Sequence, residues 1–482
     1  MTHEHFKQAL AEKFALSYSP SQREAVDRFI AFLQEREENL FLLKGYAGTG
    51  KTSLVAAIVN TLVAFGFQVV LLAPTGRAAK VFSAYAGLPA YTIHKKIYRQ
   101  RDARDGIGLF QLGFNGGANA LFFVDEASMI GAELSDSTFG SGSLLDDLFR
   151  YVYNGRGNRL VLIGDDAQLP PVGTRLSPAL DADFLQRHHA VRVHEAALTH
   201  VMRQAEASGI LYNATRVRQM IGRAGLPRLQ AARFQDIRRV TGAELIEELE
   251  QSYSRVGEDE TVVICRSNRQ AQRFNAGIRG RILYREEALS TGDRVMIVKN
   301  NYFWLSPGQD GEKTADKTPT DFIANGDMAT ILRVGRHADR YGFHFARVRL
   351  RLHGREEETE AWVMLDTLAT EYPSLTRDEY ARLYAAIEED HVDEPSRQKR
   401  YKKILENEFF NALQLKFAYA ITGHKAQGGQ WHTVLLDPGQ GRADTPDDEY
   451  WRWLYTAFTR ARASLLLVNF ADAWFENKKV EK

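Results

Sequence analysis

A phosphate-binding loop is the part of this sequence that most directly implies chemistry. Residues 45–52 read GYAGTGKT, between an apolar run and a helical pattern. Glycines let the backbone bend tightly and bring several N–H groups close to one polyphosphate. Lys51 adds a point charge for the outer phosphates, and Thr52 offers a hydroxyl group to Mg²⁺. This context favours a nucleoside triphosphate site over an ordinary glycine-rich turn. The predicted binding residues are Gly45, Gly48, Thr49, Gly50, Lys51 and Thr52.

Two acidic residues follow another apolar run, downstream of this loop. Asp125 and Glu126 come directly after residues 121–124. Hydrolysis of a γ-phosphate needs one acid to hold Mg²⁺ and another to orient or deprotonate the attacking water. We assign these roles to Asp125 and Glu126 respectively. Alone, such a pair is typical of a solvated turn, but beside a complete phosphate loop the catalytic interpretation is favoured.

A third apolar run ends in the polar block GDDAQLPP at residues 164–171. Ligands of open α/β sheets bind at the ends of strands, so this block is expected near the same nucleotide. The amide of Gln168 is then placed where it can sense the γ-phosphate. A turn rich in Asp and Pro is the alternative.

Length and composition limit the class of protein. The chain has 482 residues, of which 44% are hydrophobic, enough for about three or four domains. The formal net charge of +1 means that a nucleic-acid partner would need a localised basic groove. A single cysteine, Cys265, excludes an intramolecular disulfide and fits a reducing compartment. No apolar run approaches the ~18 residues of a membrane span, so we expect a soluble, cytoplasmic protein with no membrane partner.

Short apolar strands alternate with helical stretches, which predicts an α/β fold with parallel sheets. The first set of predicted strands covers residues 41–43, 69–73, 121–124 and 160–163. The second set covers residues 261–265, 415–422, 432–436 and 465–469. Two such sets indicate two similar domains. Residues 305–412 differ from both and indicate an inserted β-rich module.

Taken in order, these blocks resemble the conserved motifs of superfamily 1 helicases. The later half agrees, because residues 198–204, 420–428 and 455–462 resemble motifs IV, V and VI. The block containing Gln168 and the motif V block are most similar to the RecD, Dda and Pif-type branch. Members of that branch translocate 5′ to 3′ on single-stranded DNA, so the resemblance implies the same direction.

The resemblance also implies a domain plan. It has two RecA-like parallel-sheet domains, with a small hairpin domain inserted in the first and an SH3-like β-barrel module inserted in the second. The expected limits are 1–83 and 120–184 for the first RecA-like domain, 84–119 for the hairpin, 185–304 and 413–482 for the second RecA-like domain, and 305–412 for the barrel module with helices.

Two basic segments have less specific interpretations. Residues 94–101 are basic and hairpin-like, and correspond either to a strand-separating pin or to a solvated surface excursion. Arg347, Arg349 and Arg351 alternate with apolar residues, so they share one face of a predicted strand. A solvated outer face is favoured for them, with guidance of DNA as the alternative.

By the same resemblance, ATP and Mg²⁺ bind between the two sheets. Arg203 and Arg460 match the arginines that the opposite domain delivers to the transition state. The alternative for each is an ordinary surface arginine, since most arginines are exposed. Gln22 matches the glutamine that reads adenine. Hydrolysis then drives a cycle of domain motion that ratchets a bound strand forward.

The residues expected to contact the phosphates of DNA follow from three further motif positions. Helix caps and sheet positions are the alternative for the threonines among them. Ala426 stands where motif V commonly has a hydroxyl residue, and Gly423 replaces an aliphatic one. Both departures bear on the DNA contacts and not on the nucleotide chemistry. The candidates are Thr75, Thr92, His94, Thr422 and His424.

The resulting prediction is an ATP-dependent DNA helicase, an ATP hydrolase that unwinds duplexes. A translocase subunit of a nuclease or repair complex shares every motif and stays open. A P-loop switch or small-molecule kinase needs neither a second sheet nor paired arginines, which argues against it. The expected partners are single-stranded DNA and its junctions with duplex, with a nuclease or single-strand-binding protein as a further candidate. We expect a monomer, and a nuclease activity would need a partner because the resemblance extends from Gln22 to Arg460.

Overall fold

The computed structural model describes most of the chain and divides it into two compact units. The first unit comprises Met1–Tyr98, Leu112–Ile264 and Gly423–Lys482, and the second comprises Arg99–Gln111 and Cys265–Thr422. The described residues are 3–14, 17–35, 39–100, 110–132, 140–201, 207–301, 303–305, 323–439 and 446–476.

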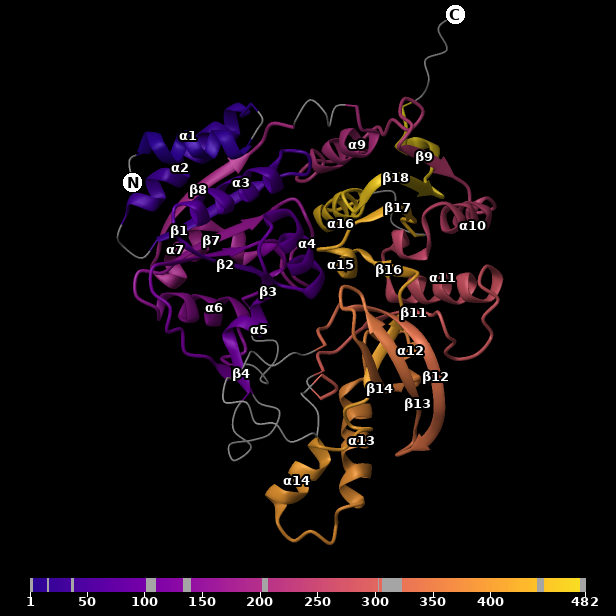
Figure 1. The fold of residues 1–482 in the computed structure, drawn as a ribbon. Helices are drawn as coiled ribbons and strands as arrows, with labels where there is room; N and C mark the ends of the chain where they lie inside the picture. The colour runs from indigo at the N-terminus through magenta and orange to yellow at the C-terminus, as the bar shows by residue number, and fades with distance from the viewer. Residues whose placement is uncertain are drawn as a thin grey trace, which may run out of the picture. The chain divides into compact units, whose positions relative to one another are not determined.

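A six-stranded parallel sheet forms the N-terminal part of the first unit (Figure 1). Its order is β3-β2-β6-β7-β1-β8. The central strand β6 is buried at every position, as expected for a parallel sheet covered on both faces. The strands are β1 (Asn39–Gly45), β2 (Gln68–Ala73), β3 (Ala90–Thr92), β6 (Ala120–Val124), β7 (Arg159–Gly164) and β8 (Arg192–Leu198).

Helices connect and cover these strands. Helix α2 begins at a capping box, in which the Ser19 side chain accepts from the Gln22 backbone N–H, a motif that satisfies donors left open at a helix start. Phe29 of α2 packs edge-on against Phe41 of β1, with ring centres 5.1 Å apart. The helices are α1 (His3–Phe14), α2 (Pro20–Gln34), α3 (Lys51–Ala64), α4 (Gly76–Ala86), α5 (Ile93–Ile97), α6 (Leu144–Tyr153) and α7 (Ala182–His189), with short 3₁₀ turns at Ala127–Met129 and Pro178–Leu180.

A second sheet has the order β16-β10-β17-β18-β9. Its pairs β10–β17, β17–β18 and β18–β9 are parallel, so the two predicted parallel sheets are confirmed. The strands are β9 (Ile237–Val240), β10 (Thr261–Cys265), β16 (Ala420–Thr422), β17 (Trp431–Leu436) and β18 (Ala461–Val468). The associated helices are α9 (Gly209–Arg218), α10 (Leu245–Val256), α15 (Gly423–Ala426) and α16 (Asp448–Phe458), with 3₁₀ turns at Glu258–Glu260 and Asp472–Trp474.

The strand expected at residues 415–422 is wrong as a single element. The chain instead forms β15 (Leu413–Phe417) and then β16, with Ala418 and Tyr419 between them. The two strands belong to different sheets. The predicted run, residues 415–422, is largely apolar on both sides of this boundary, so its pattern does not reveal where the chain leaves one sheet for the other.

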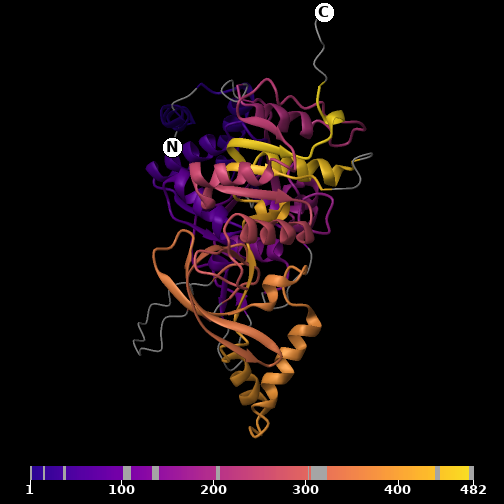
Figure 2. The same cartoon turned by 90° about the vertical axis from the view of Figure 1, so that its right-hand side faces the viewer.

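The second unit contains a closed five-stranded barrel, which confirms the expected inserted β-barrel. Its interior is apolar and includes Val295, Ile331, Val348 and Leu415. In Figures 1 and 2 the long strands β12 and β13 form its curved wall. The strands are β11 (Arg294–Ile297), β12 (Met328–Arg340), β13 (Phe343–Leu352), β14 (Glu358–Met364) and β15. Two of them, β11 and β15, flank the stretch 305–412, and the domain limits themselves stay predictions.

Four helices accompany the barrel in this unit. Leu383 of α13 and Ile404 of α14 join Phe345 and Trp362 of the barrel in one apolar cluster. This cluster explains why charged helices with few apolar residues stay attached to the barrel, since each contributes its buried positions to it. The helices are α11 (Asn268–Arg281), α12 (Asp366–Ala369), α13 (Arg377–Glu389) and α14 (Arg397–Leu405).

The basic face of β13 is neutralised by acids on β14. Arg347 lies 3.2 Å from Glu360, and Arg351 lies 2.9 Å from Glu358. Arg349 also faces Glu358, at 3.7 Å. Such exposed pairs contribute roughly 0–1 kcal/mol each, and they leave little uncompensated charge on this face. The arrangement favours the solvated outer face over a DNA guide.

The predicted hairpin interrupts the first sheet between β3 and β6. Strands β4 (Tyr98–Gln100) and β5 (Phe110–Leu112) pair as a two-stranded sheet. Residues 101–109 between them lie outside the described part of the chain. Among the helices that are described, none has both the length and the apolar character needed to cross a bilayer.

Candidate nucleotide and nucleic-acid site

The phosphate-binding loop joins β1 to α3, and its glycines are required by the local geometry. Gly48 and Gly50 have φ angles of 77° and 74°, in the left-handed region that strains other residues. Gly45 is confined instead by its surroundings, because a Cβ atom there would lie 3.2 Å from both Leu198 Cβ and Thr49 Oγ1. A side chain at any of these three positions would therefore strain the loop or displace a neighbouring side chain.

Side-chain hydrogen bonds hold the loop in this shape. The Thr49 hydroxyl donates to the Tyr46 carbonyl at 2.7 Å. The buried Gln22 amide donates to the Thr49 carbonyl at 2.9 Å and accepts from the Ser19 backbone N–H at 2.9 Å. Gln22 thus shapes the loop, and its adenine-reading role stays a prediction. The Lys51 ammonium group donates to the Gly45 carbonyl at 3.0 Å, folded back over the loop.

Asp125 follows β6, the strand that pairs with β7 on one side and β2 on the other. Its carboxylate accepts from the Tyr85 hydroxyl at 2.6 Å and from the Glu126 backbone N–H at 2.9 Å. Burial raises the pKa of Asp125, and the nearby Glu126 charge adds to this, while the Lys51 charge lowers it. The structure therefore brings the predicted lysine and the predicted acids into one electrostatic environment.

Glu126 and Gln168 carry buried oxygen atoms that lack a protein partner. Glu126 adopts a left-handed backbone with φ of 52°, a conformation that costs a non-glycine residue about 1–3 kcal/mol. Among the described residues, neither Glu126 Oε2 nor Gln168 Oε1 has a hydrogen-bond partner. A buried unpaired polar atom costs about 1–3 kcal/mol, so these atoms suit a bound group. The carboxylate of Asp125 and the hydroxyl of Thr52 are oxygen ligands of the kind that Mg²⁺ prefers.

Arg460 follows α16 of the second sheet and is only 3% exposed. Its guanidinium group donates to the Thr456 carbonyl at 3.0 Å and to the Gly429 carbonyl at 3.2 Å. One of its nitrogens lies 4.0 Å from Glu126 Oε1. Arg460 therefore lies close to Glu126, one of the two acids that follow strand β6 of the first sheet. Arg203, the other predicted arginine, lies outside the described residues.

A tyrosine that sequence reasoning did not assign connects the two sheets at this point. The Tyr455 hydroxyl donates to Asp165 at 2.6 Å and accepts from the Ala47 backbone N–H of the phosphate loop at 2.9 Å. Burial raises the pKa of Asp165, and the Lys51 charge opposes this shift. A signal was present in the sequence, because Asp165 follows β7 just as Asp125 follows β6.

Replacing Tyr455 with phenylalanine tests this connection. The change leaves one carboxylate oxygen and one loop N–H without their partner, at a cost of about 1–3 kcal/mol for hydrogen bonds that involve a charged group. We expect a lower melting temperature, by roughly 1–2 °C for each kcal/mol lost in a unit of this size, in scanning calorimetry. Tyr372→Phe is the control, since that side chain is 61% exposed. Equal melting temperatures for the two variants would contradict the proposed link.

Three of the DNA candidates lie at one edge of the first sheet. Thr75 follows β2 and Thr92 ends β3, and these parallel strands are neighbours. The Thr75 hydroxyl caps α4 by accepting from the Ala78 N–H at 3.2 Å, and Thr92 caps α5 in the same way. His94 lies in the first turn of α5. Both threonines are therefore helix caps, as the alternative interpretation expected. The starts of the two helices still carry backbone N–H groups that suit a phosphate. The role of these residues in binding DNA stays a prediction.

The motif V departures have a packing explanation. A Cβ atom on Gly423 would lie 2.6 Å from the Trp453 ring, so Trp453 fills the space that an aliphatic side chain would take. Ala426 is fully buried, so its small side chain lies within the packed interior. Thr422 is buried at the end of β16. Burial lowers the pKa of His424, and the nearby Glu449 charge opposes this shift.

Motif V and the loop after it also contact segments that follow strands of the first sheet. The Gln427 amide donates to the Leu169 carbonyl at 2.7 Å. Arg77, in the first turn of α4, donates to the Gln430 carbonyl at 2.9 Å and stacks over Trp431 with 3.8 Å between its guanidinium carbon and the ring centre. These contacts place the loop after α15 against the segments that carry Gln168 and Thr75.

Comparison with known proteins agrees with this arrangement. A family model described as an AAA domain matches residues 17–234, and one described as a UvrD-like helicase C-terminal domain matches residues 417–468. The ATP-dependent RecD2 DNA helicase of Deinococcus radiodurans is 24% identical over 447 residues, which covers 90% of this chain and 47% of that protein. The chain is thus similar to a RecD-type DNA helicase along most of its own length. It spans about half the length of this RecD2 relative.

Solved structures of Pif1 helicases are also similar to this chain. One, of two coordinating Pif1 helicases at forked double-stranded DNA, has a TM-score of 0.46 at 15% identity and covers 96% of this chain and 95% of that one. Another, Pif1 from Bacteroides in complex with ADP-AlF3 and single-stranded DNA, has a TM-score of 0.45 at 16% identity, with the same coverage of 96% and 95%.

Proposed function

We propose that this chain is an ATP-dependent DNA helicase that moves 5′ to 3′ along single-stranded DNA and unwinds duplexes. The observation that carries the proposal is the placement of Arg460. Its buried guanidinium group comes from the second sheet and lies 4.0 Å from Glu126, beside a complete phosphate loop. A loose phosphoryl-transfer transition state spreads negative charge over several oxygens, and a cation supplied across the cleft stabilises that charge.

The described side chains divide the work of hydrolysis between them. Backbone N–H groups of residues 45–50 and the Lys51 ammonium group bind the phosphates, while Thr52 and Asp125 hold Mg²⁺, which neutralises phosphate charge when bound. Glu126 orients the attacking water through its unpaired oxygen. Gln168 senses the γ-phosphate through its own unpaired oxygen by way of that water. Arg203, which lies outside the described residues, is proposed to act with Arg460 on the transition state.

Contacts between the two sheets support coupling of hydrolysis to motion. The Tyr455 hydroxyl joins Asp165 to the phosphate loop, and Arg77 joins α4 to the loop after motif V. A change in the nucleotide therefore reaches segments expected to hold DNA. The proposed phosphate contacts are Thr75, Thr92, His94, Thr422 and His424. The domain limits 1–83 with 120–184, 84–119, 185–304 with 413–482, and 305–412 are part of the same proposal.

A translocase subunit of a nuclease or repair complex is the second candidate. It would use the same nucleotide residues and would unwind DNA weakly when isolated. A P-loop switch or kinase is less well supported, because neither needs an arginine from a second sheet beside Glu126. A monomeric state, a cytoplasmic location, and a nuclease or single-strand-binding partner stay predictions from the sequence.

Unwinding assays with a single tail test the activity and its direction. We expect ATP-dependent separation of duplexes that carry a 5′ single-stranded tail and little separation of those with a 3′ tail. We also expect ATP hydrolysis to rise when single-stranded oligonucleotide is added. The Lys51→Ala variant, purified in parallel, controls for contaminating helicases. Equal unwinding from both tails would contradict the direction, and hydrolysis indifferent to oligonucleotide would contradict the motor itself.

A further inference from the structure

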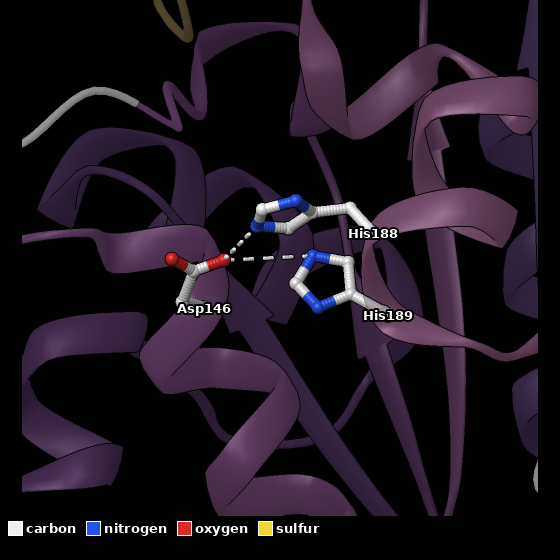
Figure 3. Close-up of side chains that lie close together, drawn as sticks. All are labelled: Asp146, His188 and His189. Atoms are coloured by element: carbon white, nitrogen blue, oxygen red, sulfur yellow. Dashed lines mark ion pairs between the residues drawn. The ribbon is translucent and has the colours of Figure 1, made fainter.

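A cluster of potential metal ligands lies outside the nucleotide site, where α6 meets α7. Asp146 lies in the first turn of α6, and His188 and His189 end α7 (Figure 3). Both rings point an Nε2 atom at the same carboxylate oxygen, Asp146 Oδ1, at 3.4 Å from His188 and 3.7 Å from His189. Within the described parts of the chain, this is the one group whose three ligand atoms all lie within 4.8 Å of one another.

Two of these ligand atoms are buried and lack a hydrogen bond. Neither Asp146 Oδ1 nor His189 Nε2 has a hydrogen-bond partner among the described residues. The His189 side chain is only 9% exposed, and its ring stacks on Phe149 with centres 3.7 Å apart. Unpaired buried polar atoms are costly, so a cation between the carboxylate and the imidazole would satisfy both.

Ion pairs between Asp146 and the two histidines explain the cluster less well than a bound cation does. An acid at the start of one helix and histidines at the end of another do suit the two helix dipoles. However, the 3.7 Å between His189 Nε2 and Asp146 Oδ1 exceeds a normal hydrogen bond, so a direct bond between these two side chains does not account for the cluster.

We propose that Asp146, His188 and His189 bind one divalent transition-metal ion of the Zn²⁺ type, with water as the fourth ligand. Zinc takes His nitrogen and Asp oxygen at about 2.0–2.2 Å in tetrahedral geometry, which places ligand atoms roughly 3.3–3.6 Å apart. The observed separations from Asp146 Oδ1, 3.4 and 3.7 Å, are close to this range, and all three ligand atoms lie within 4.8 Å of one another. Imidazole ligands disfavour Mg²⁺ and Ca²⁺, so the ion of the nucleotide site would not compete.

The proposed ion would hold helices α6 and α7 together and would take no part in ATP hydrolysis. Helix α6 leads into β7, which Asp165 follows, and α7 leads into β8 at the edge of the sheet. An ion that binds the folded chain and not the unfolded chain stabilises it by mass action. The consequence is a melting temperature that depends on zinc.

The test compares zinc binding by the metal-stripped full chain and three variants, of which two remove a proposed ligand and one is a control. His188→Ala removes a ligand whose side chain is 53% exposed, so the core is not opened. His344→Ala is the matched control, because His344 is an exposed histidine 3.0 Å from a single carboxylate, Asp366, on the barrel. Titration calorimetry with ZnCl₂ in excess Mg²⁺ gives stoichiometry and affinity, and Co²⁺ absorption reports tetrahedral coordination.

We expect one zinc ion per chain for the unmodified protein and for His344→Ala. Affinity should fall by at least about tenfold in His188→Ala, the lower bound for loss of even an outer contact of a metal site. Zinc should raise the melting temperature of the unmodified protein by roughly 2–4 °C and leave His188→Ala unchanged. Asp146→Asn, which keeps the size of the side chain, should behave like His188→Ala. Unchanged zinc affinity in both His188→Ala and Asp146→Asn, or no zinc binding by the unmodified chain, would overturn the proposal.

Discussion

Replacing Lys51 with alanine is expected to lower kcat/KM for ATP hydrolysis by about 10²–10³-fold, the usual effect of removing one preorganised electrostatic group. The ammonium group lies over the phosphate loop and interacts with the charges of both Asp125 and Asp165. Its loss removes the point charge for the outer phosphates and leaves two buried acids uncompensated. Steady-state hydrolysis, together with binding of a fluorescent ADP analogue, measures the effect as weaker nucleotide binding.

The control for this change is Lys7→Ala. That lysine lies on α1, is 44% exposed and pairs with Asp27, so its loss should leave hydrolysis unchanged. Lys51 makes only one hydrogen bond to the loop backbone in the described structure, and the fold should survive its removal. A Lys51→Ala protein that binds and hydrolyses ATP normally would show that the nucleotide lies elsewhere.

Replacing Arg460 with alanine is expected to lower kcat by about 10³-fold or more, with a smaller change in nucleotide affinity. Arginines supplied to a phosphoryl-transfer transition state contribute about 10³–10⁵ in kcat. A loss confined to kcat indicates an interaction made only in the transition state. Comparison of steady-state rates with equilibrium nucleotide binding separates the two effects.

Arg460 also has structural contacts, so its test needs further variants. Its guanidinium group bonds the carbonyls of Thr456 and Gly429, and alanine would leave them unpaired. Arg460→Lys keeps the charge in a different geometry and should also lose turnover, since lysine does not reproduce the planar fork. Arg462→Ala is the control, because that side chain is half exposed and pairs with Glu260. Normal hydrolysis by Arg460→Ala would remove this arginine from the mechanism.

The sequence predicted the strands whose burial is complete and missed those at the edges. Strand β6 is apolar throughout and β7 is apolar after Arg159, which is the pattern of a covered parallel sheet. Strand β8 reads RVHEAAL and lies at the sheet edge, where two of its seven residues are exposed and three are half-buried, so its apolar pattern is interrupted by polar residues. The short strands β3 and β9 lack a detectable period for the same reason.

The candidate site was predictable where chemistry depends on local order and not where it depends on tertiary contact. The loop residues and Asp125 with Glu126 are adjacent in sequence, so their types and spacing identify them. The bond from Tyr455 to Asp165 joins positions far apart in the chain and needs both sheets to be folded. The cluster of Asp146 with His188 and His189 depends in the same way on two helices meeting.

The backbone at Gly423 lies directly against the ring of Trp453, so the sizes of the residues at these two positions depend on each other in related sequences. A methyl group at position 423 would overlap the indole unless the indole gave way. Packed interiors resist added volume at a cost of about 1–3 kcal/mol, so the two positions should change together, a bulkier residue at one accompanying a slimmer residue at the other. An aligned set of homologues in which both sites are large at once would disprove this exchange.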